Sequence, residues 1–99
     1  MKVIHKFIEQ MKEELEGARN YAEKYLEHKA RGEMAIAKKY AEMAEDELKH
    51  ATYIKEITTG EVEELKKVYK FPESLDEEWI HAHKHFAECM AITKQMLLM

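Results

Sequence analysis

The chain has 99 residues, of which 45% are apolar and 36% charged, and its formal net charge is −4. This length allows one domain with a modest core, and the composition is neither that of a disordered chain nor that of a membrane span. No apolar run approaches the ~20 residues that cross a bilayer, and no basic segment followed by an apolar stretch marks a signal peptide. We therefore expect a cytoplasmic protein that binds neither membranes nor nucleic acid, because nucleic acid selects basic surfaces.

The available side chains limit which kinds of metal site this chain can form. Cys89 is the single cysteine, so the sequence excludes an internal disulfide, a CxxC redox motif and a zinc or iron site built from thiolates. Six histidines and many glutamates remain. Any metal site in this chain should therefore use nitrogen and oxygen ligands.

The first half of the chain predicts two long helices. Ala, Glu, Lys, Leu and Arg make up just over half of the residues, a composition typical of long helices, and we find no strand-like alternation. Gly32 separates a predicted helix over residues 3–29 from a second over residues 33–58. A short turn between two long helices predicts an antiparallel hairpin over residues 1–58, followed by a packing and oligomerisation segment over residues 59–99.

Two capping-box patterns predict further helices in the second half, Thr58-x-x-Glu61 and Ser74-x-x-Glu77. The first pattern, beside Gly60, predicts a short helix over residues 60–70. The second, after Pro72, predicts a last helix over residues 75–97. The expected fold class is all-α within a single domain.

Each long helix carries a stripe of apolar and aromatic residues at alternating three- and four-residue steps, which antiparallel packing requires. The stripe of the first helix consists of Ile4, Phe7, Met11, Glu14, Ala18, Tyr21, Tyr25 and His28. The stripe of the second helix consists of Ile36, Tyr40, Met43, Glu47, His50, Ile54 and Ile57. Glu14 interrupts the first stripe at mid-length, and Glu47 and His50 interrupt the second.

These three interruptions should meet. In a hairpin that turns near residue 31 they lie at nearly the same height, because each helical residue rises ~1.5 Å. A buried carboxylate is costly unless it is neutralised or paired, and the Glu-x-x-His spacing puts both side chains on one helix face. The Glu-x-x-His spacing alone is not specific, because it recurs at Glu78 and His81. The alignment of Glu47 and His50 with Glu14 across the turn is what predicts that these three residues bind a metal ion.

At these residues the chain resembles the ferritin-like di-iron carboxylate proteins, and among them the encapsulated ferritins. The resemblance covers roughly residues 8–58 and rests on two motifs, Glu13-Glu14-Leu15-Glu16 with Tyr21 after it, and Asp46-Glu47-Leu48-Lys49-His50-Ala51. It implies that Glu14, Glu47 and His50 are catalytic ligands of a di-iron centre in a four-helix bundle, with Glu47 as a bridge. Tyr21 either fills the bundle near these ligands or takes part in electron transfer with the metal site. Manganese shares these ligands, and zinc is a further alternative.

The resemblance also implies an assembly and an activity. The chain holds one complete ligand set, so a second hairpin should complete the bundle in a homodimer or a higher homo-oligomer. Such proteins are ferroxidases, which oxidise Fe(II) to Fe(III) with O2 or peroxide in iron storage or detoxification. An encapsulin shell is a further partner of this family, but the end of this chain, Lys94-Gln95-Met96-Leu97-Leu98-Met99, has no recognisable targeting tail.

Other residues leave alternatives open. Glu78, His81, His85 and Glu88 share one face of the last helix and form either a secondary metal site or a solvated surface. Glu78 and His81 also offer a second Glu-x-x-His motif within the same chain. His83 lies on the apolar stripe of that helix and is expected to be a packed core histidine. The alternative for the whole chain is a non-catalytic helical oligomerisation module that binds structural zinc, structural calcium or no metal.

Overall fold

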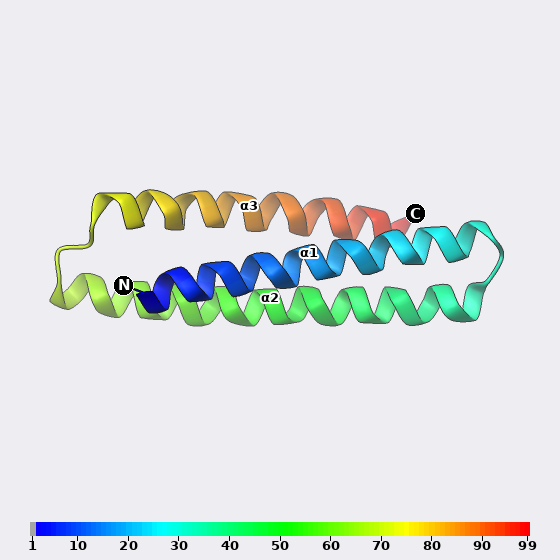
Figure 1. Ribbon diagram of the computed structural model, residues 1–99, viewed down its shortest axis with the longest axis horizontal. Helices are drawn as coiled ribbons and strands as arrows, with labels where there is room; N and C mark the ends of the chain where they lie inside the picture. The colour runs from blue at the N-terminus through cyan, green and yellow to red at the C-terminus, as the bar shows by residue number, and fades with distance from the viewer. Residues whose placement is uncertain (1) are drawn as a thin grey trace.

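A computed structural model describes residues 2–99 as three α-helices: α1 (Lys2–Ala30), α2 (Met34–Val68) and α3 (Glu73–Leu98). These residues contain no strand, which confirms the predicted all-α class. The helices lie side by side in a rod of 55 × 17 × 16 Å, and α2 runs antiparallel to both α1 and α3 (Figure 1). None of the three helices has the length and apolar character needed to cross a membrane.

A three-residue turn reverses the chain between α1 and α2. Gly32 has a φ of +75°, a conformation that L side chains rarely adopt, so a glycine is required there. The backbone N–H of Glu33 donates to the carbonyl of His28 at 3.0 Å, and the Glu33 carboxylate lies 3.1 Å from the His28 ring. The turn therefore closes the C-terminal end of α1 and starts α2 back along it.

The predicted break between residues 58 and 60 is wrong, because α2 runs without interruption to Val68. Thr58 does not cap a new helix: it is fully buried, and its hydroxyl donates to the carbonyl of Ile54 at 2.7 Å. Val62 is also buried and extends the same stripe by another turn. The segment predicted as a short helix over residues 60–70 is thus the C-terminal part of α2, and the predicted boundary at residue 58 lies inside a continuous helix.

The start of α3 also differs from the prediction. The helix begins at Glu73, and Pro72 rather than Ser74 occupies the N-cap position, without a side-chain cap. Proline is tolerated there because the first helical turn has no use for its missing N–H. Lys66 near the end of α2 contacts Asp76 in the first turn of α3 at 3.0 Å, which ties the two helices together across the connection.

The buried core differs from the predicted seam by a rotation of the helices. In α1 the buried residues are Ile4, Ile8, Met11, Leu15, Ala18 and Ala22, and in α2 they are Ala37, Ala44, Leu48, Ala51, Ile54, Thr58 and Val62. The predicted α2 stripe is therefore only partly buried in the single chain: Ile54 lies in the core, whereas Ile36, Met43 and Ile57 are 45%, 39% and 51% exposed. The packing of α3 against α1 explains the shift, because it moves the enclosed core toward α3 and leaves the predicted stripe along the opposite edge.

Candidate metal site

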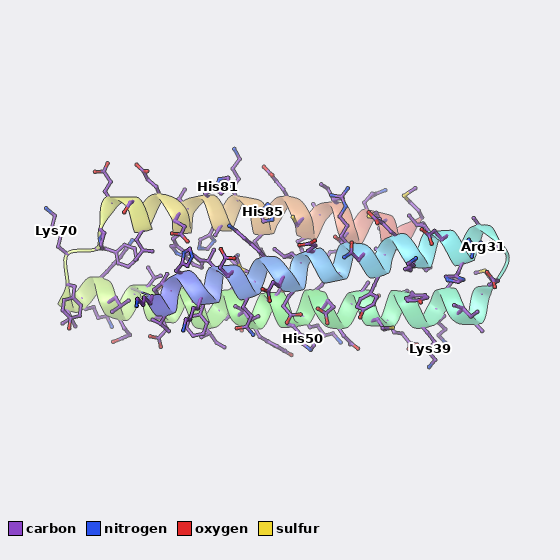
Figure 2. The ribbon with its side chains drawn as sticks, viewed as in Figure 1. Arg31, Lys39, His50, Lys70, His81 and His85 are labelled. Carbon is purple, nitrogen blue, oxygen red and sulfur yellow. The ribbon has the colours of Figure 1, made fainter. Side chains whose placement is uncertain are left out.

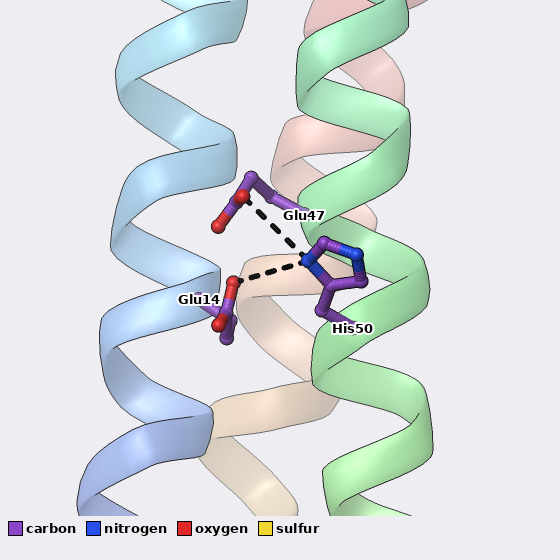
Figure 3. A group of neighbouring side chains, drawn as sticks. All are labelled: Glu14, Glu47 and His50. Atoms are coloured by element: carbon purple, nitrogen blue, oxygen red, sulfur yellow. Dashed lines mark ion pairs between the residues drawn. The ribbon is translucent and has the colours of Figure 1, made fainter.

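The edge of the α1–α2 interface that lies opposite α3 brings together Glu14, Glu47 and His50. Glu14 lies near the middle of α1, and Glu47 and His50 lie one turn apart on α2 (Figure 3). Each offers one ligand atom, and these atoms lie within 4.8 Å of one another. In residues 2–99 no other group of three or more His, Cys, Asp or Glu side chains meets this criterion. The turn at Gly32 and the helical rise place the three at one height.

The cluster is half-buried. His50 Nδ1 lies 3.5 Å from Glu14 Oε2 and 3.7 Å from Glu47 Oε1. The two glutamate side chains are about a quarter exposed, at 23% and 25%, whereas His50 is 52% exposed. The prediction that these groups are enclosed within the hairpin seam is therefore wrong for a single chain. Their outer side faces solvent because the enclosed core lies on the other side of α1 and α2.

The two carboxylates disturb each other in the absence of a cation. A hydrogen bond shared with Glu14 is the largest cause that raises the pKa of Glu47, and partial burial and the Glu14 charge act in the same direction. The nearby His50 opposes this shift without cancelling it. Carboxylates at such short range do not both ionise freely. The metal-free cluster therefore retains a proton more readily than an isolated glutamate does, and a divalent cation would relieve the same repulsion.

The donor set fits a divalent transition metal. Carboxylate oxygen and imidazole nitrogen bind zinc at about 2.0–2.2 Å, so two ligands of one ion lie at most about 4.4 Å apart. The three ligand atoms need only a small movement to meet this limit. Three protein ligands leave further coordination positions for a second group or an exogenous molecule, an arrangement typical of reactive rather than purely structural metal sites.

Gly17 borders the site and was missed in the sequence. A Cβ atom at this position of α1 would lie 3.1 Å from Glu47 Oε2. The carboxylate of Glu47 therefore lies directly against the backbone of α1, one turn after Glu14. The available signal was a lone glycine inside a long segment of good helix formers, where glycine is otherwise unfavourable.

An aromatic cluster extends from the site toward the turn. The ring of Tyr21 packs against that of Tyr40 with centroids 6.2 Å apart. The ring of His28 also stacks on Tyr40, with centroids 5.3 Å apart. Tyr21 follows Glu14 by seven residues on the same edge of α1. Its role beside the ligands stays a prediction.

The predicted secondary site does not gather into one group. Glu78 Oε1 lies 2.7 Å from Nδ1 of His5 on α1, and the His85 ring contacts the thiol of Cys89 at 3.4 Å. His81 and His85 lie on α3, on the far side of the rod from His50 (Figure 2). The structure therefore does not bring Glu78 and His81 to the Glu14 cluster within one chain.

His83 is half-buried and lies outside the hydrophobic core. Its ring meets Trp79 edge-on with centroids 4.2 Å apart, beside an open groove of about 570 Å³ between α2 and α3. Burial, followed by the nearby Lys55 charge, lowers the pKa of His83. Both effects favour the neutral imidazole.

The structure thus offers a metal ion two carboxylates and one imidazole from two neighbouring helices. No family model, curated protein or solved structure matches this chain. The resemblance to the ferritin-like proteins therefore rests on the residues of the two sequence motifs.

Proposed function

We propose that the chain is a ferritin-like di-iron protein that oxidises Fe(II) to Fe(III) with O2 or peroxide, for iron storage or detoxification. The observation that carries this proposal is the meeting of Glu14, Glu47 and His50 from two antiparallel helices. One Glu from a helix and Glu-x-x-His from its neighbour form half of the ligand set that holds two metal ions in helical bundles.

The second half of the site would come from another copy of the chain. Around the cluster, α2 presents an exposed row of residues at seven-residue spacing, Ile36, Met43, His50 and Ile57. Seven-residue spacing keeps these side chains on one face, which is the pattern of helices that pack against a partner. A two-fold related copy placed on this row would bury its apolar members and bring a second Glu14, Glu47 and His50 to the first set.

In such a dimer the protein residues would have distinct roles. The carboxylates of Glu14 and Glu47 would attract Fe(II) as substrate, and their negative charge favours the trivalent product over the divalent ion. Glu47 is the best placed to be shared between two ions, because it already lies between α1 and α2. Each Fe(II) gives up one electron, which O2 or peroxide accepts. The apolar row would limit the access of water once the partner covers it.

The exposed apolar members of this row, Ile36, Met43 and Ile57, also favour a second candidate. This candidate is a non-catalytic oligomerisation module with a structural divalent metal or none. Exposed apolar patches mark association surfaces whether or not chemistry occurs there. In a metal-free module, the clustered carboxylates would only cost stability, and replacing them with apolar residues would stabilise the assembly.

The two candidates separate in an anaerobic Fe(II) titration followed by admission of air, with near-ultraviolet absorbance and O2 consumption recorded together. The di-iron proposal expects binding of about one Fe(II) per chain and rapid oxidation, both lost in Glu14→Gln. Glu13→Gln is the matched control, because Glu13 is the neighbouring exposed glutamate of α1. Absence of iron binding in the unmodified protein, or equal binding by Glu14→Gln, would overturn the proposal.

A further inference from the structure

Gly17 has no backbone reason to be glycine. It lies inside α1, and among residues 2–99 the only glycine with a positive φ is Gly32. A glycine in a helix interior lowers helix stability relative to alanine, because it has more conformational freedom to lose. The absence of a side chain at this position therefore needs a cause in the surrounding packing.

The space beside Gly17 is filled by the end of the Glu47 side chain. A Cβ at Gly17 would lie 3.1 Å from Oε2, 3.7 Å from Cδ and 3.8 Å from Cγ of Glu47. The first of these distances is shorter than ordinary van der Waals contact. Figure 3 shows the Glu47 carboxylate reaching from α2 toward α1, near Glu14. The Glu47 carboxylate thus lies against Gly17, which has no side chain to displace it, and near Glu14.

We propose that Gly17 is a positioning residue of the metal site, which lets Glu47 lie across α1 beside Glu14 and within reach of the ion that His50 binds. Its consequence for metal binding rests on the proposed function, whereas its steric role does not. An alanine at position 17 would displace the carboxylate by a few tenths of an ångström or turn it into another rotamer. Metal–ligand distances tolerate only about 0.2 Å of deviation.

Gly60 provides a matched control. It also lies inside a helix, α2, and nothing lies within 4 Å of a Cβ built at that position. Gly60→Ala therefore has the same intrinsic effect on helix stability without displacing a neighbour. Gly32 cannot serve as a control, because its positive φ would strain any replacement.

The steric role is tested without metal by urea denaturation of Gly17→Ala and Gly60→Ala, each made in the unmodified chain and in Glu47→Ala. Gly60→Ala should raise the denaturation midpoint equally in both backgrounds. Gly17→Ala should raise it less than Gly60→Ala in the unmodified chain, and as much as Gly60→Ala once Glu47 is shortened. An equal effect of Gly17→Ala in both backgrounds would overturn the steric role.

The positioning role is tested by anaerobic Fe(II) binding. Gly17→Ala should weaken binding about ten-fold or more, as the loss of a group that orients a ligand typically does, whereas Gly60→Ala should bind as the unmodified chain does. Equal binding by Gly17→Ala and the unmodified chain would overturn the positioning role. If the unmodified chain binds no Fe(II), the proposed function fails, and the denaturation cycle alone still decides whether Gly17 accommodates Glu47.

Discussion

Two sides of α1 differ in how the rest of the chain covers them. The side that packs under α2 and α3 is wholly apolar, and Ile8, Met11 and Leu15 keep at most 1% of their surface exposed. The neighbouring side, along the outer edge of α2, carries Glu14 and half-buried aromatic residues. The rest of the chain therefore buries one stripe of α1 and α2, the closed core. It leaves the neighbouring stripe, which carries Glu14, Met43, Glu47 and His50, partly exposed, and this is the open stripe.

The ionisable cluster of Glu14, Glu47 and His50 lies on the open stripe and not in the closed core. Within the closed core an unpaired carboxylate would cost several kcal/mol, and the residues buried there are apolar apart from two threonines. On the open edge, Glu14 and Glu47 keep part of their hydration, with about a quarter of each side chain exposed. In the proposed dimer, a cation and a partner helix cover this edge without leaving a charge unpaired.

The largest expected difference between the two stripes is in stability. Leu15→Ala should lower the free energy of unfolding by about 2–5 kcal/mol, because it opens a cavity in the closed core. Met43→Ala on the open stripe should cost less than about 1 kcal/mol, because Met43 is already 39% exposed. Urea denaturation at low protein concentration measures both changes. Similar losses in the two variants would show that the stripes are not differently buried.

A charge on the open stripe should act on association rather than on folding. Met43→Lys should weaken self-association at least about ten-fold, because a partner would have to bury the ammonium group, and its helical circular dichroism should stay unchanged. Ile92→Lys, at an exposed position of α3, is the control. Sedimentation equilibrium measures both variants, and a stronger effect of Ile92→Lys would place the interface elsewhere.

The open stripe also shows how far the sequence predicts this structure. Glu14, Glu47 and His50 were predictable as neighbours because the turn signal at Gly32 and the helical rise set their height. Their exposure was not, because it depends on where α3 packs, and that contact joins residues far apart in sequence. The break at Thr58 failed for a related reason: its capping pattern is local, and burial of Thr58 and Val62 in the tertiary core overrides it.

The pH dependence of stability should distinguish the open stripe in the absence of metal. Because the pKa of Glu47 is raised above its ordinary 4.5 in the folded chain, the folded state binds protons more readily than the unfolded state, and stability falls as pH rises through the raised value. Glu47→Gln should therefore stabilise the metal-free protein near pH 7, by about 1 kcal/mol at most.

Urea denaturation between pH 4 and pH 8 with a chelator present tests this sign. The advantage of Glu47→Gln should shrink as pH falls toward 4.5 and disappear below it. Glu13→Gln, which removes an exposed carboxylate of α1, is the matched control. An advantage of Glu47→Gln that grows as pH falls would contradict the account of the carboxylate pair.

The smallest effect is expected at the polar contact on the other side of α1. His5 and Glu78 join α1 to α3 at 2.7 Å, but their side chains are 59% and 33% exposed. His5→Ala should therefore cost about 0.5 kcal/mol or less and leave Fe(II) binding unchanged. Calorimetric titration with Fe(II) under anaerobic conditions provides the comparison, and a loss of binding would mean that the α3 side takes part in the metal site.

Native mass spectrometry of the protein loaded anaerobically with Fe(II) tests the central claim most directly. It reports how many chains and how many metal ions occur in the same particle. The account predicts metal-loaded species with an even number of chains and about one ion per chain, and Glu14→Gln without bound metal. Stoichiometric metal binding by single chains, or the same loading in Glu14→Gln, would contradict a metal site that Glu14, Glu47 and His50 of two chains share.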